Sequence, residues 1–199
     1  MKKILAGALA LAATAALADT AVAQLPNVTP FSVEVRAGVA LPTGDFGDES
    51  VAGVDLQTGL SLSGSVAYNI MPSLAVYGGY SYNRFGVDDA EDFDVIDRGF
   101  DAGLRLGVPT PLIPIDPWIK AGVVYHELEL DGDGGSISTD SELGFEVGAG
   151  LGFAILPKVT LTPGVSYSTI SMSADDDEFD GEDFDVSHIK VDIGLRIRI

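Results

Sequence analysis

The stretch Leu143–Phe153, LGFEVGAGLGF, shows the pattern that decides the fold. Apolar side chains occupy every odd-numbered position, whereas the even-numbered positions hold glycine or Glu146. Because successive side chains of a strand point to opposite faces of a sheet, this alternation predicts a β-strand with one apolar face and one small or polar face. The same period of two extends outward from this stretch in both directions.

Most of the chain from Phe31 to Ile199 alternates in this way, which predicts seven further strands. Most have about the 9–11 residues with which a tilted strand crosses a bilayer. Asn69–Ser73 and Leu156–Lys158 contain the prolines of tight turns, and Pro109–Pro117 is a proline-rich connection. The further strands are expected at 31–41, 58–68, 74–83, 99–108, 118–126, 159–168 and 188–199.

The connections between these strands alternate in kind. Those after the second, fourth and sixth strands are short or contain proline, whereas the other four are longer, polar and acidic. Outer-membrane β-barrels have short periplasmic turns and longer extracellular loops in this order. The pattern therefore predicts an all-β fold, an eight-stranded antiparallel up-and-down transmembrane barrel. The four long connections are 42–55, 86–98, 131–141 and 171–187.

The N-terminus carries an export signal. Lys2 and Lys3 precede an apolar run, Ile4–Ala18, and Ala21–Ala23 offers a small-x-small cleavage site. We expect residues 1–23 to be a cleaved signal peptide and residues 24–199 to form the barrel domain. The alternative is a retained membrane anchor, but the run is shorter than the roughly 20 apolar residues of a spanning helix.

The composition joins two opposed properties. The net charge is −19 but the mean hydropathy is +0.27, so apolar and acidic residues occupy different segments. Such acidity argues against nucleic-acid binding, which needs a basic face, and favours cationic partners. No later segment has the run of about 18 apolar residues that marks a spanning helix, so membrane insertion would require a closed sheet. Without cysteine, the chain forms neither disulfides nor thiolate metal sites.

Charged residues within the strands fall on the face opposite the apolar one. In a narrow barrel this face would line the lumen, where opposite charges pair and glycines admit larger side chains from across the barrel. The alternative is a soluble sandwich, in which the apolar face points inward and the charged face meets water. Paired charges and loop asymmetry favour the barrel. The charged residues are Glu34, Arg36, Asp101, Arg105, Lys120, Glu146, Lys190, Asp192, Arg196 and Arg198.

Several aromatic residues lie towards strand ends, where the girdles of a membrane barrel meet the two lipid interfaces. The alternative is that aromatic residues are simply common in strands. The residues concerned are Tyr68, Tyr80, Tyr82, Trp118, Tyr125 and Tyr167.

From Phe31 to Ile199 the chain resembles the family of small outer-membrane β-barrels, the OmpA-, OmpX- and OmpW-like proteins. The resemblance is carried by the strand–turn–strand stretch Gly59–Phe85, by Pro117–Tyr125 (PWIKAGVVY) and by the closing strand. It implies a location in the cell outer membrane, contact with outer-membrane lipids and lipopolysaccharide, and insertion by the barrel-assembly machinery. That machinery reads a closing strand that usually ends in an aromatic residue, whereas this chain ends in Ile199. We expect a monomer.

Some small outer-membrane barrels modify lipid A, so the histidines bear on an enzymatic function. Lipid A deacylases resemble this architecture and use a His-x-Ser arrangement with a nearby Glu, whereas here Glu127 and Leu128 follow His126. His188 follows Ser187 at a loop margin, with no third member of a triad. We predict no enzyme and no catalytic residue, with His126 at the barrel rim and His188 as the first residue of the last strand.

The last long connection is crowded with carboxylates. Asp176, Glu178, Asp180 and Gly181 would fill the first, third, fifth and sixth positions of a calcium loop, but the twelfth is Ser187, where a bidentate Glu is needed. The motif fails, and we predict no metal site and no cofactor. Two interpretations of the acidic loops stay open. They bind cations weakly, or they are solvated loops whose like charges repel each other.

The sequence identifies no ligand or reaction. It favours a structural or surface-interaction role in the outer membrane, with acidic extracellular loops and a salt-bridged lumen too filled for a broad pore. The alternatives are a narrow channel or small hydrophobic-solute transporter, a surface adhesin and, less favoured, a lipid A-modifying enzyme.

Overall fold

Strands account for most of the residues that the computed structural model describes, which are 30–47, 56–87, 90–108, 115–132, 135–172 and 184–199. The expected signal peptide, 1–23, lies outside the described residues, as do the calcium-loop candidates within 173–183. No described helix has the length and apolarity needed to cross a membrane. The elements are β1 (Phe31–Thr43), the 3-10 helix η2 (Gly44–Gly47), β2 (Gly59–Met71), β3 (Leu74–Val87), β4 (Ala90–Gly107), β5 (Ile115–Gly132), β6 (Gly135–Ser138), β7 (Glu142–Leu156), β8 (Val159–Met172) and β9 (Phe184–Arg198).

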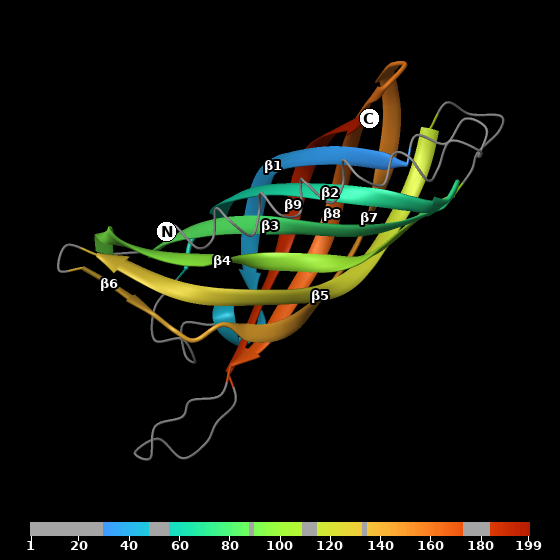
Figure 1. Ribbon diagram of the computed structural model, residues 1–199. Helices are drawn as coiled ribbons and strands as arrows, with labels where there is room; N and C mark the ends of the chain where they lie inside the picture. The colour runs from blue at the N-terminus through green and yellow to red at the C-terminus, as the bar shows by residue number, and fades with distance from the viewer. Residues whose placement is uncertain (1–29, 48–55, 88–89, 109–114, 133–134, 173–183) are drawn as a thin grey trace.

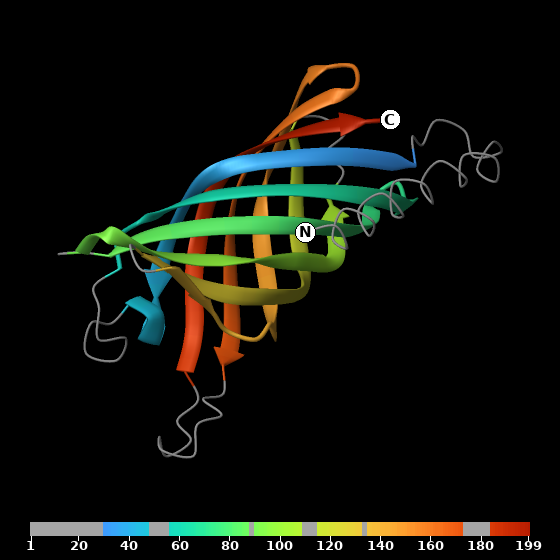
Figure 2. The same ribbon diagram turned by 60° about the vertical axis from the view of Figure 1, so that its left-hand side comes forward.

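Antiparallel pairing closes eight of these strands into a barrel (Figure 1). Neighbours pair in the order β4-β3-β2-β1-β9-β8-β7-β5, and β4 pairs with β5 to complete the ring. In Figure 2 the strands from β1 to β4 lie side by side across the front, and the others form the wall behind them. The short β6 pairs with the last residues of β5, outside the ring. The predicted eight-stranded antiparallel barrel is confirmed.

The register places the apolar residues of each strand on the outer surface. Val147, for example, pairs with Ala121 of β5 and with Tyr167 of β8. Phe145 on the same face is 54% exposed, whereas Glu146, on the opposite face, is only 2% exposed. The apolar face therefore points away from the barrel and the charged face into the lumen, as predicted, and the soluble-sandwich alternative is wrong.

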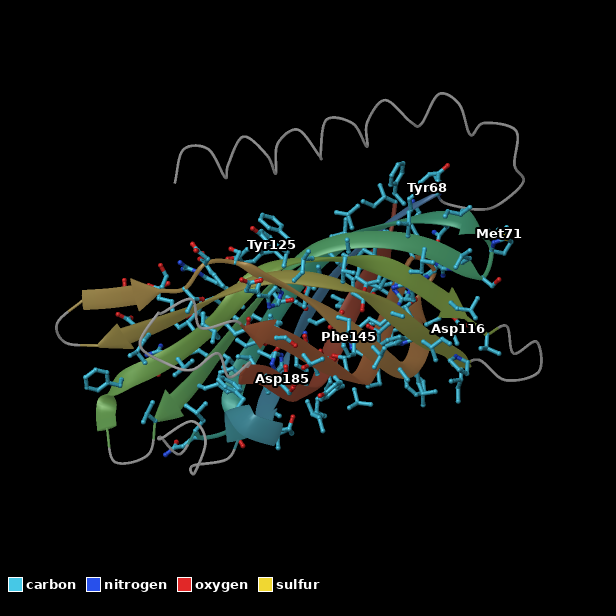
Figure 3. All side chains as sticks on the ribbon, turned by 90° about the horizontal axis from the view of Figure 1, so that it is seen from below. Tyr68, Met71, Asp116, Tyr125, Phe145 and Asp185 are labelled. Atoms are coloured by element: carbon cyan, nitrogen blue, oxygen red, sulfur yellow. The ribbon has the colours of Figure 1, made fainter. Side chains whose placement is uncertain are left out.

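The two ends of the barrel differ. At one end, the short-turn end, Pro72–Ser73 joins β2 to β3 and Pro157–Lys158 joins β7 to β8. The opposite end, the long-loop end, carries η2, the β3–β4 hairpin and β6. Figure 3 shows Tyr68 and Met71 towards the short-turn end and Asp185 towards the long-loop end.

All four connections expected as loops are partly strand, and two of them are mostly strand. β3 and β4 extend into 86–98, which is therefore largely a hairpin, and β6 lies within 131–141 and pairs with β5. In the first of these extensions Phe85 pairs with Val95, and both side chains are buried at the mouth of the lumen. The sequence pattern missed the extensions because their outer faces carry charged residues, so the alternation of apolar and polar residues is lost there.

The five tyrosines expected in the girdles face outward, whereas Trp118 does not, and the place of these tyrosines at the lipid interfaces stays a prediction. Trp118 is only 4% exposed and lies on the inner face of β5, two residues before Lys120. It points into the lumen because every second residue of this strand does so. The tyrosines that face outward are Tyr68, Tyr80, Tyr82, Tyr125 and Tyr167.

Candidate functional site in the barrel lumen

Charged side chains fill the lumen in layers along the barrel axis. β9 shows the order, because its inward side chains, from the short-turn end to the long-loop end, are Arg196, Asp192, Lys190, His188 and Val186. The layers to which these residues contribute are two ionic clusters, a histidine cluster and an apolar plug.

Glu34 of β1 is the shared acceptor of the first ionic cluster. Its Oε2 accepts hydrogen bonds from Arg105 Nη1 at 2.9 Å and from Arg196 Nε at 2.7 Å. Its Oε1 accepts hydrogen bonds from Arg36 Nη1 and from Thr162 Oγ1, the latter at 3.0 Å. One carboxylate thus meets three guanidinium groups, from β1, β4 and β9.

Arg36 connects this cluster to Asp192 and Trp118. Its Nε lies 3.0 Å from Asp192 Oδ1, and its Nη2 donates to the same oxygen. Its guanidinium carbon lies 5.1 Å from the centre of the Trp118 ring, within the range of a cation–π contact. Among the described residues, the three arginines form ion pairs with two carboxylates, Glu34 and Asp192, so the first ionic cluster carries one positive charge in excess.

The second ionic cluster is built on Glu146 of β7. Lys120 Nζ lies 2.8 Å from its Oε1, and Lys190 Nζ lies 2.9 Å from its Oε2. Tyr77 donates a longer hydrogen bond to Oε1, at 3.3 Å. The side chains of Lys190 and Glu146 are 4% and 2% exposed, so each charge depends on its partner to remain in the lumen.

The histidine cluster lies nearer the long-loop end, where His126 sits between two carboxylates of β4. Its Nδ1 is 2.7 Å from Asp97 Oδ1, and its Nε2 is 3.0 Å from Asp101 Oδ1. Ionised carboxylates only accept hydrogen bonds, so both ring nitrogens donate and the imidazole is positively charged. Asn83 Nδ2 donates to Asp97 Oδ2 at 2.9 Å, and Ser81 Oγ donates to Asp101 Oδ2.

Neither histidine lies where the sequence analysis placed it. His126 is fully buried in the lumen rather than at the rim, because β5 extends well beyond it. His188 is the fifth residue of β9, not the first, and its ring centre lies 5.8 Å from that of Phe85. Ser187 faces the other side of the strand, where its Oγ donates to Thr169 Oγ1 at 2.8 Å. Ser187 and His188 therefore form no nucleophile–base pair.

An apolar plug fills the lumen at the long-loop end. Phe46 of η2 packs edge to face on Phe85 of β3, with ring centres 5.3 Å apart, and both are buried. η2 begins at Gly44, whose φ of 61° is a backbone conformation that glycine adopts without strain. The other buried members of the plug are Ala40, Leu56, Val95, Val124, Ile170 and Val186.

Free space in the described lumen is small in the middle and larger at the short-turn end. A cavity of about 40 Å³ lies between the two ionic clusters, enough for a few water molecules. A second cavity, of about 360 Å³, opens at the short-turn end. Trp118 lines both, and glycine makes room for it, since a Cβ atom on Gly150 would lie 2.4 Å from the Trp118 Cζ2.

The structure brings together the charged residues predicted for the lumen, except Arg198, which is exposed at the short-turn end. Asp97, which was expected in the loop 86–98, also faces the lumen and is fully buried. Its spacing of four from Asp101 could have revealed it, because this spacing keeps both on one face of an extended strand. Within the described ranges, no group of three or more His, Asp or Glu side chains could hold a metal ion.

Comparisons with known proteins agree with this architecture. A family model described as "Outer membrane protein beta-barrel domain" matches residues 4–196. Neisserial surface protein A has a similar fold, with a TM-score of 0.66 and 20% identity over 85% of this chain and 97% of that one. The N-terminal β-barrel domain of Pseudomonas aeruginosa OprF has a TM-score of 0.47 and 13% identity, over 83% of this chain and 97% of that one. No curated protein matches the chain.

Proposed function

Because this chain belongs to the outer membrane protein β-barrel family, we propose that it is a non-conducting barrel of the cell outer membrane with a structural or surface-interaction role. In such barrels the short turns face the periplasm and the longer loops face outward. The observation that carries the proposal is the filling of the lumen by ion pairs at its centre and by apolar side chains at its outer mouth.

The ionic clusters oppose the passage of a solute. An ion entering the centre would have to separate Glu146 from Lys120 and Lys190, which lie 2.8 and 2.9 Å away. Removing one partner of a buried ion pair costs about 3–5 kcal/mol. Moving the two partners apart inside the lumen would likewise leave each buried charge without its partner. Beyond this layer a passing ion would meet the apolar side chains of the plug. Both layers therefore support a lumen that solutes do not cross.

The outer face of the long-loop end supports a role at the cell surface. There Arg84 pairs with Asp94, and Arg98 lies 2.8 Å from Glu127 through Nε. Arg84 lies two residues beyond the outward-facing Tyr82 and Glu127 two residues beyond Tyr125, and in membrane barrels such aromatic residues mark the change from lipid to headgroups and water. At the same end, the excess of carboxylates in the connection 171–187 favours the attraction of cationic groups.

Planar-bilayer recordings of the protein purified from outer membranes test the closed lumen. We expect no defined open steps. The same sample is run on a gel with and without boiling, because a closed barrel migrates differently before and after unfolding. Defined open steps from barrels that pass this gel control would favour the narrow channel or solute transporter instead.

A deletion strain separates the structural role from the surface role. It is complemented with the wild-type gene or with a variant in which Asp175, Asp176, Asp177 and Glu178 become amides. A structural role predicts that both genes restore detergent resistance, and a surface role predicts that only the wild-type gene restores attachment to polylysine-coated glass. If the deletion strain keeps both its detergent resistance and its attachment, the proposal is contradicted. An altered lipid A mass spectrum on expression of the protein would favour the lipid A-modifying enzyme instead.

A further inference from the structure

We propose that the cavity at the short-turn end is a binding site for a phosphate group reached from the periplasmic side. The cavity has a volume of about 360 Å³ and lies outside the first ionic cluster. Its walls come from the starts of β1 and β5, the β2–β3 turn and the ends of β4 and β9. The inference goes beyond the proposed function, and its failure would leave the conductance result untouched.

Basic residues gather at this end of an otherwise acidic protein. Arg105, Arg196 and Arg198 line the cavity, and Asp116 is the only acidic residue on its described wall. Arg105 and Arg196 share a single oxygen of Glu34, so this carboxylate cannot neutralise both. Against a net charge of −19 for the chain, the site is a local region of positive potential that attracts anions.

The wall also holds donors that lack an acceptor. Arg196 Nη2, Trp118 Nε1 and Ser32 Oγ are buried and have no hydrogen-bond partner among the described residues. Nearly all buried polar groups in proteins are paired, so these three groups leave hydrogen-bonding capacity unused in residues that line the cavity. A phosphate group supplies oxygens that accept hydrogen bonds, and the fork of a guanidinium matches two of them at once.

Apolar surface lies beside these donors. The indole of Trp118, together with Pro72, Pro117 and Val108, lines the same cavity. A phosphate group attached to an organic body fits this combination as well as inorganic phosphate does. The two natural sources are therefore a soluble periplasmic phosphate compound and the headgroup of an anionic phospholipid, and the shared chemistry is the phosphate.

Trp118 provides a local probe because it is the single tryptophan of the chain. The full-length protein, purified in neutral detergent, is titrated with inorganic phosphate at constant ionic strength, with chloride as the comparison. We expect a saturable change in tryptophan emission with phosphate only. Replacing Arg198→Gln should weaken binding about tenfold, the effect of losing one charge-assisted hydrogen bond. Replacing Asp116→Asn should tighten it, because a repelling carboxylate is removed.

The matched control is Arg84→Gln, which removes an exposed arginine at the long-loop end and should leave the titration unchanged. The source is resolved in nanodiscs of phosphatidylcholine with or without phosphatidylglycerol. Saturation by inorganic phosphate in phosphatidylcholine alone supports a soluble ligand. An emission change that needs phosphatidylglycerol and is lost in Arg198→Gln supports a headgroup. No saturable change in either arm, or equal effects of Arg84→Gln and Arg198→Gln, overturns the proposal.

Discussion

Arg196 Nε lies 2.7 Å from Glu34 Oε2, although 162 positions separate the two residues in the sequence. The contact joins the first and last strands, because β1 pairs with β9 and Glu34 stands opposite Arg196 in their register. Side chains at directly opposite positions share a face of the sheet, and here that face is the lumen. The pairing that closes the barrel therefore also completes the first ionic cluster.

Replacing Glu34→Gln should strongly destabilise the barrel. It removes the charge that faces Arg36, Arg105 and Arg196, and it leaves these guanidinium groups to repel each other in a confined space. Removing one partner of a buried ion pair costs about 3–5 kcal/mol. The loss is measured as the change in free energy of unfolding by urea in detergent micelles, followed by tryptophan emission.

The matched control for this variant is Asp94→Asn, which breaks the pair with Arg84 on the outer face. The Arg84 side chain is 54% exposed, so this change should cost less than about 1 kcal/mol. An equal loss of stability in the two variants would contradict the role given to Glu34.

Lys190 should contribute more to stability than Lys120, although both bind Glu146. The Lys190 side chain is 4% exposed and the Lys120 side chain is 17% exposed. We expect Lys190→Gln to cost about 3 kcal/mol in the same unfolding assay and Lys120→Gln clearly less. A further Glu146→Gln change should cost less in the Lys190→Gln background than in the wild type, because the pair is already broken. Simple additivity would show that Glu146 and Lys190 are not coupled.

The two histidines should respond differently to the same substitution. His126→Phe leaves Asp97 and Asp101 without their shared donor, and we expect a loss of about 3–5 kcal/mol. His188→Phe is the matched control, because neither ring nitrogen of His188 has a hydrogen-bond partner among the described residues. We expect less than about 1 kcal/mol there, since an apolar ring beside Phe85 replaces an unsatisfied one. A larger loss for His188→Phe would reject this reading of the histidine cluster.

Phe46→Ala should open the outer mouth without opening the centre. Val186 belongs to the same apolar plug as Phe46, and the sequence contains no cysteine, so Val186→Cys places a single thiol in the plug. We expect this thiol to be protected from a polar maleimide added to whole cells, and to react once Phe46→Ala is introduced. Conductance should stay absent, because the ionic clusters remain. Defined open steps in the Phe46→Ala variant would show that the plug alone closes the lumen.

The strand positions could be predicted because the membrane-facing part of the barrel repeats one simple pattern. The stretch 143–153 lies entirely within β7, and the tight turns expected after the second and sixth strands occur between β2 and β3 and between β7 and β8. Lipid contact demands an apolar residue at every second position, so the pattern marks the membrane-facing part of each strand. Beyond the lipid this demand ends, and the extensions of β3, β4 and β5 could not be recognised.

Two single residues, Trp118 and His126, lie in environments other than those expected from the sequence. Trp118 was assigned to a girdle from its residue type, although its position in β5 turns it into the lumen with Lys120. His126 was placed at the rim because the predicted strand ended there, whereas β5 continues and leaves it buried between Asp97 and Asp101. The true strand length, which depends on pairing with neighbours, decides the environment of His126, whereas the alternation along β5 decides that of Trp118.

The sequence by itself determined which side chains meet lipid and which meet the lumen, because a strand alternates strictly and one face of each strand is apolar. Only the tertiary structure decided which lumen charges pair. Glu34 meets Arg105 from 71 positions away and Lys190 meets Glu146 on a non-adjacent strand. Such partners are set by the register and closure of the whole ring, which no local stretch of sequence encodes.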